Sequence, residues 1–228
     1  MKDRQKKILK AAVKEYQRIG QPVSSQLLAT RFRLDLSPAT VRAEMLSLDE
    51  DGFLEQPHTS AGRIPTDKAW RFLLEELEEN GVSENEKKQI LVRIEKLHWE
   101  SIKEVAQFLA DCSKGLGISG MFGRMADFHE AGFKWLLDDS ESLEGILKEF
   151  DSLGDDFDKF FARLDEPVKV FIGQENPIKY LRDFSLIVSA FENEDGAGLL
   201  GILGPKRMNY QKNKFVVEET RKRLKKRE

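Results

Sequence analysis

The sequence of 228 residues has few side chains of the kinds that form disulfides or bind transition metals, with one cysteine and three histidines. A single cysteine, Cys112, excludes a disulfide within the chain and every zinc-finger pattern. No stretch approaches the roughly 18 consecutive apolar residues of a membrane-spanning helix, and the N-terminal MKDRQKKILK lacks the apolar core of a secretory signal. We therefore expect a cytoplasmic protein with no membrane partner.

Patterns of catalytic residues are also missing from the chain. His58, His98 and His129 do not stand in a metal-ligand spacing such as HExxH. The glycine-rich runs at 115–123 and 196–204 match neither phosphate-binding glycine motif in the context that each requires. The sequence therefore assigns no catalytic residue, no metal and no cofactor, and predicts a protein that is not an enzyme.

Charge is distributed unevenly, although the net charge is only -3. Residues 1–74 contain 13 Lys and Arg against 9 Asp and Glu, whereas residues 75–219 contain 18 against 30. Residues 220–228 are again basic, with 6 against 1. A basic end on an acidic body is typical of a chain in which one domain meets a polyanion, although solvated faces produce charge runs as well.

The first 74 residues follow the order of a winged helix-turn-helix domain. Apolar residues at helical spacing predict a helix over 2–19, and a second short helix follows a serine cap and ends near residue 32. Ser37 and Pro38 are a strong start signal for a third helix, because serine caps and proline fits the first position. Residues 53–65 then read as a hairpin, the wing of such a domain.

In this arrangement the third helix enters the major groove and the hairpin lies along the backbone or in the minor groove. Arg42 is the candidate for reading guanine or clamping a phosphate, and Arg63 is the cation expected at the wing. Ala39 and Ala43 are small enough for the helix to lie deep in the groove. The predicted DNA contacts are Ser24, Ser25, Gln26, Ser37, Pro38, Ala39, Thr40, Arg42, Ala43, His58, Thr59, Ser60 and Arg63.

The region after the wing reads as one long helix over 84–114, because apolar residues continue at spacings mostly of three and four, with His98 in the gap between Ile94 and Ile102. We expect this helix to form the seam of a homodimer, although packing within the chain is the alternative. The predicted seam residues are Leu91, Ile94, Ile102, Val105 and Leu109.

The second half predicts a mixed α/β domain, so the fold class expected for the whole chain is α+β. Glycines near 115–120 read as an interruption, residues 124–164 as short helices, and 168–172, 184–191 and 199–203 as strands. A final helix over 212–227 carries a basic tail. The expected division is a DNA-binding domain at 1–81, a long helix at 82–120 and an effector domain at 121–228.

Four segments resemble one family closely. PHTSAGRIPTDKAWR (57–71) is similar to the wing signature of the heat-inducible transcription repressor HrcA family, and SPATVRAEM (37–45) is similar to its recognition helix. VFIGQEN (170–176) and GLLGILGPKRMNY (198–210) resemble its C-terminal GAF-like effector domain. The resemblance implies a dimeric repressor of chaperone operons that binds the inverted-repeat CIRCE operator, is released on heat shock and is supported by the chaperonin GroEL.

Two departures from the family pattern affect what is expected. The family usually has Asn where this chain has Ala43, so the operator sequence is expected to differ. Family members are usually longer, and the early strands and an inserted dimerisation segment are expected to be absent here between the long helix and residues 115–120. Two alternatives stay open: a ligand-responsive winged-helix regulator with a pocket near GPKRMNY, and a chaperone-associated interaction protein with vestigial DNA binding.

Overall fold

A computed structural model describes residues 1–76, 82–98, 101–121, 127–136, 164 and 167–225. The chain divides into two compact units, Met1–Leu77 and Glu78–Glu228, which are described separately below. Within the described residues, no helix has the length and apolar character needed to cross a membrane.

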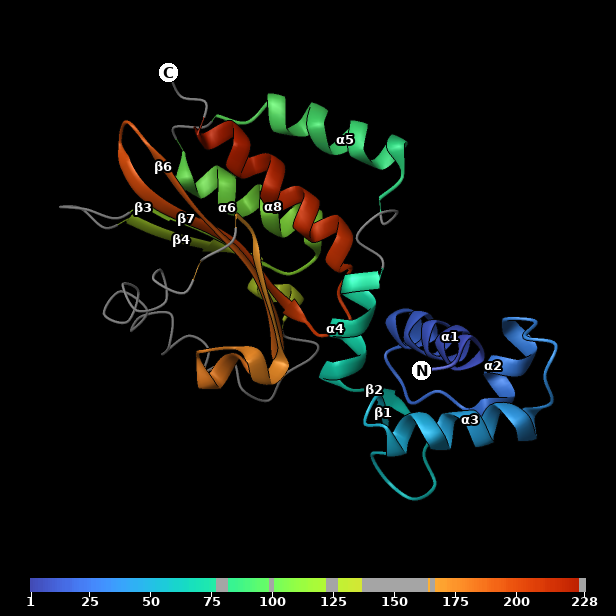
Figure 1. Cartoon of the computed structure of the whole chain (residues 1–228). Helices are drawn as coiled ribbons and strands as arrows, with labels where there is room; N and C mark the ends of the chain where they lie inside the picture. The colour runs from blue at the N-terminus through green and yellow to red at the C-terminus, as the bar shows by residue number, and fades with distance from the viewer. Residues whose placement is uncertain (77–81, 99–100, 122–126, 137–163, 165–166, 226–228) are drawn as a thin grey trace. The chain divides into compact units, whose positions relative to one another are not determined.

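The N-terminal unit contains four helices and a two-stranded hairpin (Figure 1). Its elements are α1 (Asp3–Ile19), α2 (Ser25–Arg31), α3 (Pro38–Glu50), β1 (Leu54–Glu55), β2 (Ile64–Pro65) and α4 (Asp67–Glu76). The strands pair antiparallel, with Leu54 opposite Pro65 and Glu55 opposite Ile64. The predicted order of three helices, a hairpin and a fourth helix is therefore confirmed.

Local sequence signals explain where these helices begin and end. The Ser24 and Ser37 hydroxyls accept hydrogen bonds from the backbone N–H groups of Leu27 and Thr40, at 3.2 and 3.1 Å, and so cap α2 and α3. Gly20 ends α1 in the left-handed conformation with φ of 66°, which glycine adopts without strain. The helices then bury a common apolar core in which each side chain is at most 2% exposed: Ile8, Leu9, Leu28, Val41, Met45, Leu48, Leu54 and Trp70.

The described part of the C-terminal unit contains a five-stranded antiparallel sheet with the order β4-β3-β7-β6-β5. Its strands are β3 (Leu116–Met121), β4 (Asp127–Ala131), β5 (Lys169–Ile172), β6 (Phe184–Asn193) and β7 (Gly196–Pro205). Its helices are α5 (Glu84–Glu95), α6 (Ile102–Ser113) and α8 (Tyr210–Lys225), with short 3₁₀ turns at Phe133–Trp135, Gly173–Glu175 and Lys179–Leu181.

The two faces of this sheet are covered differently. Helices α6 and α8 pack on one face, and α5 packs against α8 (Figure 1). On the other face Leu116, Leu203, Leu186 and Phe171 form a row across four strands, because the register places them opposite one another. Both faces are therefore buried, and the fold class is α+β as predicted.

The long helix predicted over 84–114 is wrong, because α5 ends at Glu95 and α6 begins at Ile102. Ser101 caps the new helix by accepting from the backbone N–H of Glu104 at 3.3 Å. The apolar spacing continues across the break because both helices face the interior of one unit. Residues 82–120 therefore do not form a separate part of the chain but belong to the C-terminal unit.

This break also changes the interpretation of the predicted dimer seam. Ile94, Val105 and Leu109 are at most 4% exposed, because they pack inside their own unit. Ile102 is half-buried, and only Leu91 reaches the surface, at 36% exposure. The five residues therefore do not form one continuous seam.

The glycine-rich stretch at 115–120 was predicted to interrupt the fold, yet it is strand β3, and residues 127–131 are strand β4 instead of a helix. The sheet therefore contains β3 and β4 in addition to the three strands that the sequence predicts. Within the predicted short helices, Phe133–Trp135 forms a 3₁₀ turn, and residues 124–126 and 137–163 lie outside the described residues. The three predicted strands and the final helix are confirmed as β5, β6, β7 and α8.

Candidate nucleic-acid interface

Helix α3 presents three different faces to its surroundings. Val41, Met45 and Leu48 are at most 1% exposed and attach it to the core. A second face is polar and meets α1. The third face is exposed and follows a helical spacing of three and four residues through Ala39, Arg42, Ala43 and Leu46. This third face is the part of α3 that a nucleic acid can reach.

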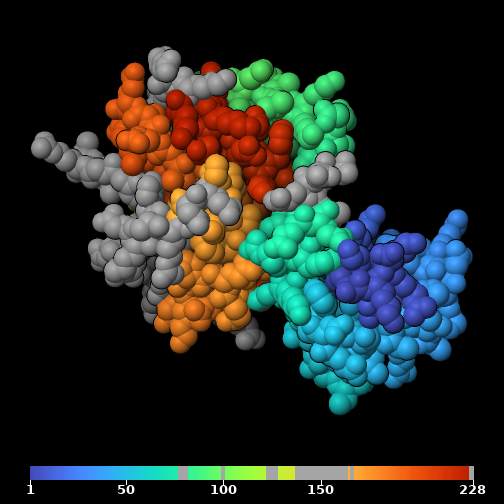
Figure 2. Space-filling view, in the orientation of Figure 1, coloured from blue at the N-terminus to red at the C-terminus, as the bar shows by residue number. Residues whose placement is uncertain are grey.

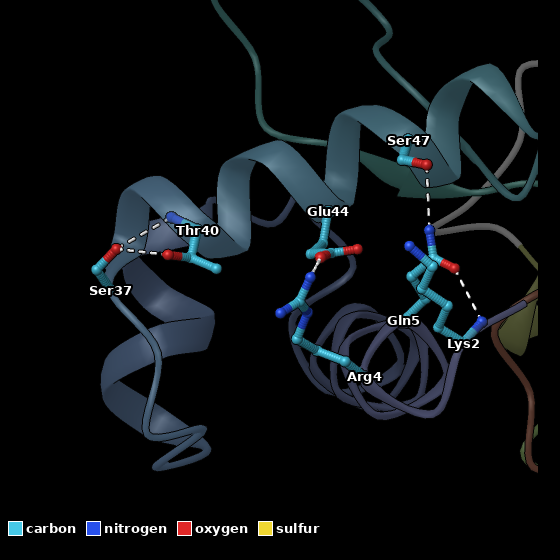
Figure 3. Close-up of polar contacts among 7 residues, drawn as sticks. All are labelled: Lys2, Arg4, Gln5, Ser37, Thr40, Glu44 and Ser47. Carbon is cyan, nitrogen blue, oxygen red and sulfur yellow. Dashed lines mark hydrogen bonds and ion pairs between the residues drawn. The ribbon is translucent and has the colours of Figure 1, made fainter.

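Polar contacts connect the second face of α3 to α1 (Figure 3). Arg4 forms an ion pair with Glu44, whose side chain is 12% exposed. The Gln5 amide donates to the Ser47 hydroxyl at 3.1 Å and accepts from the backbone N–H of Lys2 at 2.9 Å. These contacts fix how far α3 is rotated about its own axis and neutralise Glu44, the only carboxylate between Pro38 and Leu48.

The start of α3 is organised by two hydroxyl groups. The Ser37 hydroxyl accepts from the Thr40 backbone N–H and lies 2.9 Å from the Thr40 hydroxyl (Figure 3). Both side chains therefore hold the first turn of the helix in shape. The partial positive charge of a helix N-terminus remains directed outward there, which favours an anion.

The hairpin loop projects from the surface of the N-terminal unit (Figure 2). His58, Thr59 and Ser60 are exposed at its tip, as predicted. The Gln56 amide donates to the backbone carbonyls of Thr59 and Ala61 at 3.0 and 2.9 Å, which closes the loop from inside. Sequence patterns gave no indication of this role, because a glutamine before Pro57 carries no turn signal of its own.

The returning side of the hairpin is joined to the segment that precedes α2. Val23 and Arg63 exchange two backbone hydrogen bonds of 2.9 Å each. A Cβ atom on Gly62 would lie 2.5 Å from the Val23 carbonyl carbon and oxygen, so only glycine permits this close approach. The wing is therefore attached to the helices by its backbone as well as by side chains.

Arg63 is not a cation at the tip of the wing, and this expectation from the sequence is wrong. Its guanidinium donates to the Asp49 carboxylate on α3 at 2.8 Å, and its side chain is only 13% exposed. The residue directly precedes β2 and connects the base of the hairpin to the end of α3. Arg63 therefore acts as a positioning residue within the unit.

Many cations of α1 are also engaged inside the unit. Glu15 is 1% exposed and pairs with Arg18 and with Arg31 of α2, at 2.6 and 2.9 Å. The hydrogen bond from Arg18 is the largest cause that holds the Glu15 pKa below its ordinary value. Lys6 and Lys10 pair in the same way with Glu76 of α4. Most basic side chains of α1 therefore form ion pairs within the N-terminal unit.

The other predicted contact residues lie where a ligand can reach them. Within the described residues Arg42 makes no ion pair, and its side chain is exposed. Sequence reasoning missed Leu46, although its spacing from Ala39 and Arg42 along the helix was the available signal. The further positions are exposed at Ser24, Gln26, Ser37, Ala39 and Ala43, and half-buried at Ser25, Pro38 and Thr40.

The arrangement is that of a helix–hairpin unit joined in one chain to an α+β domain. Residues 66–213 match the family model described as "HrcA protein C terminal domain". Because this match covers more than half of the chain, the chain belongs to the HrcA family.

Individual relatives agree with this assignment. The chain is 44% identical over 107 residues to the heat-inducible transcription repressor HrcA of Natranaerobius thermophilus, a match that covers 47% of this chain and 31% of that protein. It is 25% identical to the protein of the same name from Thermodesulfovibrio yellowstonii over 335 aligned positions, which cover 94% of each. The matched part of the chain thus spans about a third of the relatives with the strongest matches.

A solved structure supports the fold. The crystal structure of a hypothetical protein at 2.2 Å resolution superimposes with a TM-score of 0.79, at 21% identity, covering 98% of this chain and 97% of that one. At this identity the likeness concerns the fold alone.

Proposed function

We propose that the chain is a transcriptional repressor that binds operator DNA through its N-terminal unit, acts as a homodimer, and releases the operator when the temperature rises. The observation that carries this proposal is the exposed face of α3, where Arg42 stands between small side chains beside a neutralised Glu44. A helix with such a face fits the major groove, where its N-terminal half meets base edges.

In this proposal Arg42 reads a base and the unit's other polar groups hold the backbone. Arginine binds guanine O6 and N7 with two parallel hydrogen bonds from one planar group, a geometry that the ammonium of lysine matches less well. The N-terminus of α3 and the tip residues His58, Thr59 and Ser60 are placed to meet phosphates, since N–H and O–H groups donate to them. Arg63 contributes by fixing the hairpin on α3 rather than by touching DNA.

Dimerisation belongs to the proposal because the family resemblance implies an inverted-repeat operator, and release by heat belongs to it because of the relatives' printed name. An inverted repeat requires a two-fold protein whose half-sites are spaced by the dimer. Because the affinity of a dimer for two half-sites far exceeds that of one unit for one half-site, a dimer that loosens on heating loses the operator. The relatives' printed name, heat-inducible transcription repressor, is the reason for choosing heat as the signal.

Selection of bound duplexes from a random pool by the full chain tests this proposal. We expect an inverted repeat to be enriched, and its affinity to fall steeply with salt and with temperature. Recovery of no preferred sequence, with the same weak affinity for every duplex, would contradict sequence-specific repression. Enrichment of a single half-site would contradict the dimer alone.

Two variants of one residue then test the role of Arg42. Arg42→Ala should weaken binding by about 1–3 kcal/mol and relax the preference at one base pair of each half-site. Arg42→Lys keeps the charge, so the salt dependence should stay close to that of the parent while the base preference weakens, because the ammonium lacks the planar two-donor geometry of arginine. If neither variant changes the base preference, Arg42 contacts phosphate and does not read a base.

A further inference from the structure

The exposed face of α3 contains apolar side chains at positions where a surface helix usually has polar ones. Leu46 is 49% exposed there, and Ala39 and Ala43 are exposed beside it. These three residues stand at i, i+4 and i+7, so their side chains form one stripe along the helix. The core side of the same helix is occupied by other residues, so the stripe does not serve the packing of its own unit.

Charge on and around the stripe indicates a polyanionic partner. Arg42 lies within the stripe, and Arg4 neutralises Glu44 on the adjoining face of the helix. The helix N-terminus lies at one end, which again favours negative charge. An apolar protein surface would leave Arg42 without an anion, whereas DNA supplies both phosphates and an apolar group.

The apolar group that DNA presents in its major groove is the C5 methyl of thymine. Ala39 and Leu46 are seven residues apart, which is about 10 Å along the helix at ~1.5 Å per residue. That distance corresponds to about three base pairs at ~3.4 Å each. The stripe is therefore long enough to contact methyl groups on either side of a base that Arg42 reads.

We propose that Leu46, together with Ala39 and Ala43, determines specificity by packing against thymine methyl groups of the operator half-site. This inference rests on the proposed function, because it assumes that α3 lies in the major groove. Its ligand is a thymine-bearing base step, and Leu46 is a specificity-determining residue outside the N-terminal positions of α3 that the sequence singled out.

Deoxyuridine tests this inference, because it differs from thymidine only by the missing methyl group. The full chain is titrated with the duplex recovered by selection and with copies in which one thymine of each half-site is replaced by deoxyuridine. At the thymine that Leu46 contacts, we expect about fourfold weaker binding per half-site, the factor that corresponds to one buried methyl group. Leu46→Ala should weaken binding to the thymine duplex and make binding insensitive to that replacement.

Val92→Ala is the matched control variant. Val92 is also 49% exposed but lies on α5 in the C-terminal unit, so its truncation should leave the deoxyuridine effect unchanged. The thermal unfolding of both variants is measured beside the titrations, since an exposed side chain should change it little.

The outcomes separate this inference from the function on which it rests. Sequence-selective binding that changes less than twofold at every deoxyuridine position would overturn the role of the stripe and leave the repressor proposal intact. A deoxyuridine effect that persists at full size in Leu46→Ala would overturn the role of Leu46. If no duplex is preferred, the repressor proposal fails, and the inference fails with it.

Discussion

The contact between Arg63 and Asp49 offers a sharp test of how the wing is held. The guanidinium donates to the carboxylate at 2.8 Å, and the two side chains are 13% and 30% exposed. Hydrogen bonds to charged groups contribute about 1.5–3 kcal/mol, and the partial exposure of Asp49 places this pair near the lower end. We therefore expect Arg63→Ala to destabilise the N-terminal unit by about 1.5 kcal/mol.

Hydrogen exchange in the full chain measures this effect within the N-terminal unit itself. Amides of α1 and α3 that exchange by opening of the unit should do so about tenfold faster in Arg63→Ala, since 1.4 kcal/mol is a factor of ten. Asp49→Ala should give a similar change. The double variant should be scarcely worse than either single one, because both remove the same contact.

Binding to DNA decides between positioning by Arg63 and direct contact. If Arg63 only positions the hairpin, both variants weaken binding and neither changes its dependence on salt. A direct phosphate contact by Arg63 predicts opposite signs, because Asp49→Ala removes a negative charge and strengthens binding while Arg63→Ala weakens it. In that case Arg63→Ala would also reduce the salt slope by about 0.9, and the reasoning from the structure would be refuted.

Three further predictions concern buried groups in the two units. Glu15→Gln should destabilise the N-terminal unit by about 1.5 kcal/mol in urea unfolding at pH 7, because Arg18 and Arg31 lose charge-assisted hydrogen bonds but remain about half exposed to water. Because the pKa of Glu15 is lowered in the folded state, its ionised form stabilises the fold above the ordinary carboxyl pKa, and this stabilisation is lost as pH falls through the lowered value. The free energy of unfolding of Glu15→Gln should therefore fall less steeply with decreasing pH than that of the parent. An equal slope for both proteins would contradict this. Burial raises the pKa of the Cys112 thiol, so iodoacetamide should modify this thiol far more slowly in the native protein than in urea. Mass spectrometry measures the two rates, and equal rates would contradict the burial of Cys112. Gly117→Ala places a Cβ atom 2.1 Å from the Ala106 carbonyl oxygen and should lower stability by about 1–3 kcal/mol or more, whereas unchanged urea unfolding would show that α6 lies farther from the sheet.

The sequence predicted the N-terminal unit well because its signals are local. Ser37 and Pro38 mark a helix start through groups within one turn, and Ser24 acts in the same way for α2. The role of Arg63 was not predictable from such signals, because its partner Asp49 is 14 residues away and lies on a different element. Exposure of a charged side chain depends on contacts that a local pattern does not contain.

The errors in the C-terminal unit have two physical origins. Glycines at 117 and 120 read as turn residues, yet Gly117 faces the backbone of α6 and Gly120 faces the Phe128 ring, each closer than a Cβ atom permits. Glycine here serves close packing of a helix or ring on a strand, not chain reversal. The end of α5 at Glu95 escaped detection for a different reason, since the sequence between α5 and α6 contains neither glycine nor proline and both helices bury apolar side chains.

The order of strands in the sheet has a consequence for how proteins of this family differ in length. Among the described residues, β4 and β5 follow one another in the chain and are the two outermost strands, so the chain passes from one edge of the sheet to the other between Ala131 and Lys169. Crossing four strand spacings of ~4.8 Å requires about 19 Å, which six extended residues can reach. The pairing of the described strands therefore sets only a minimum length for this connection. Relatives can differ in the number of residues there while the sheet keeps the same register.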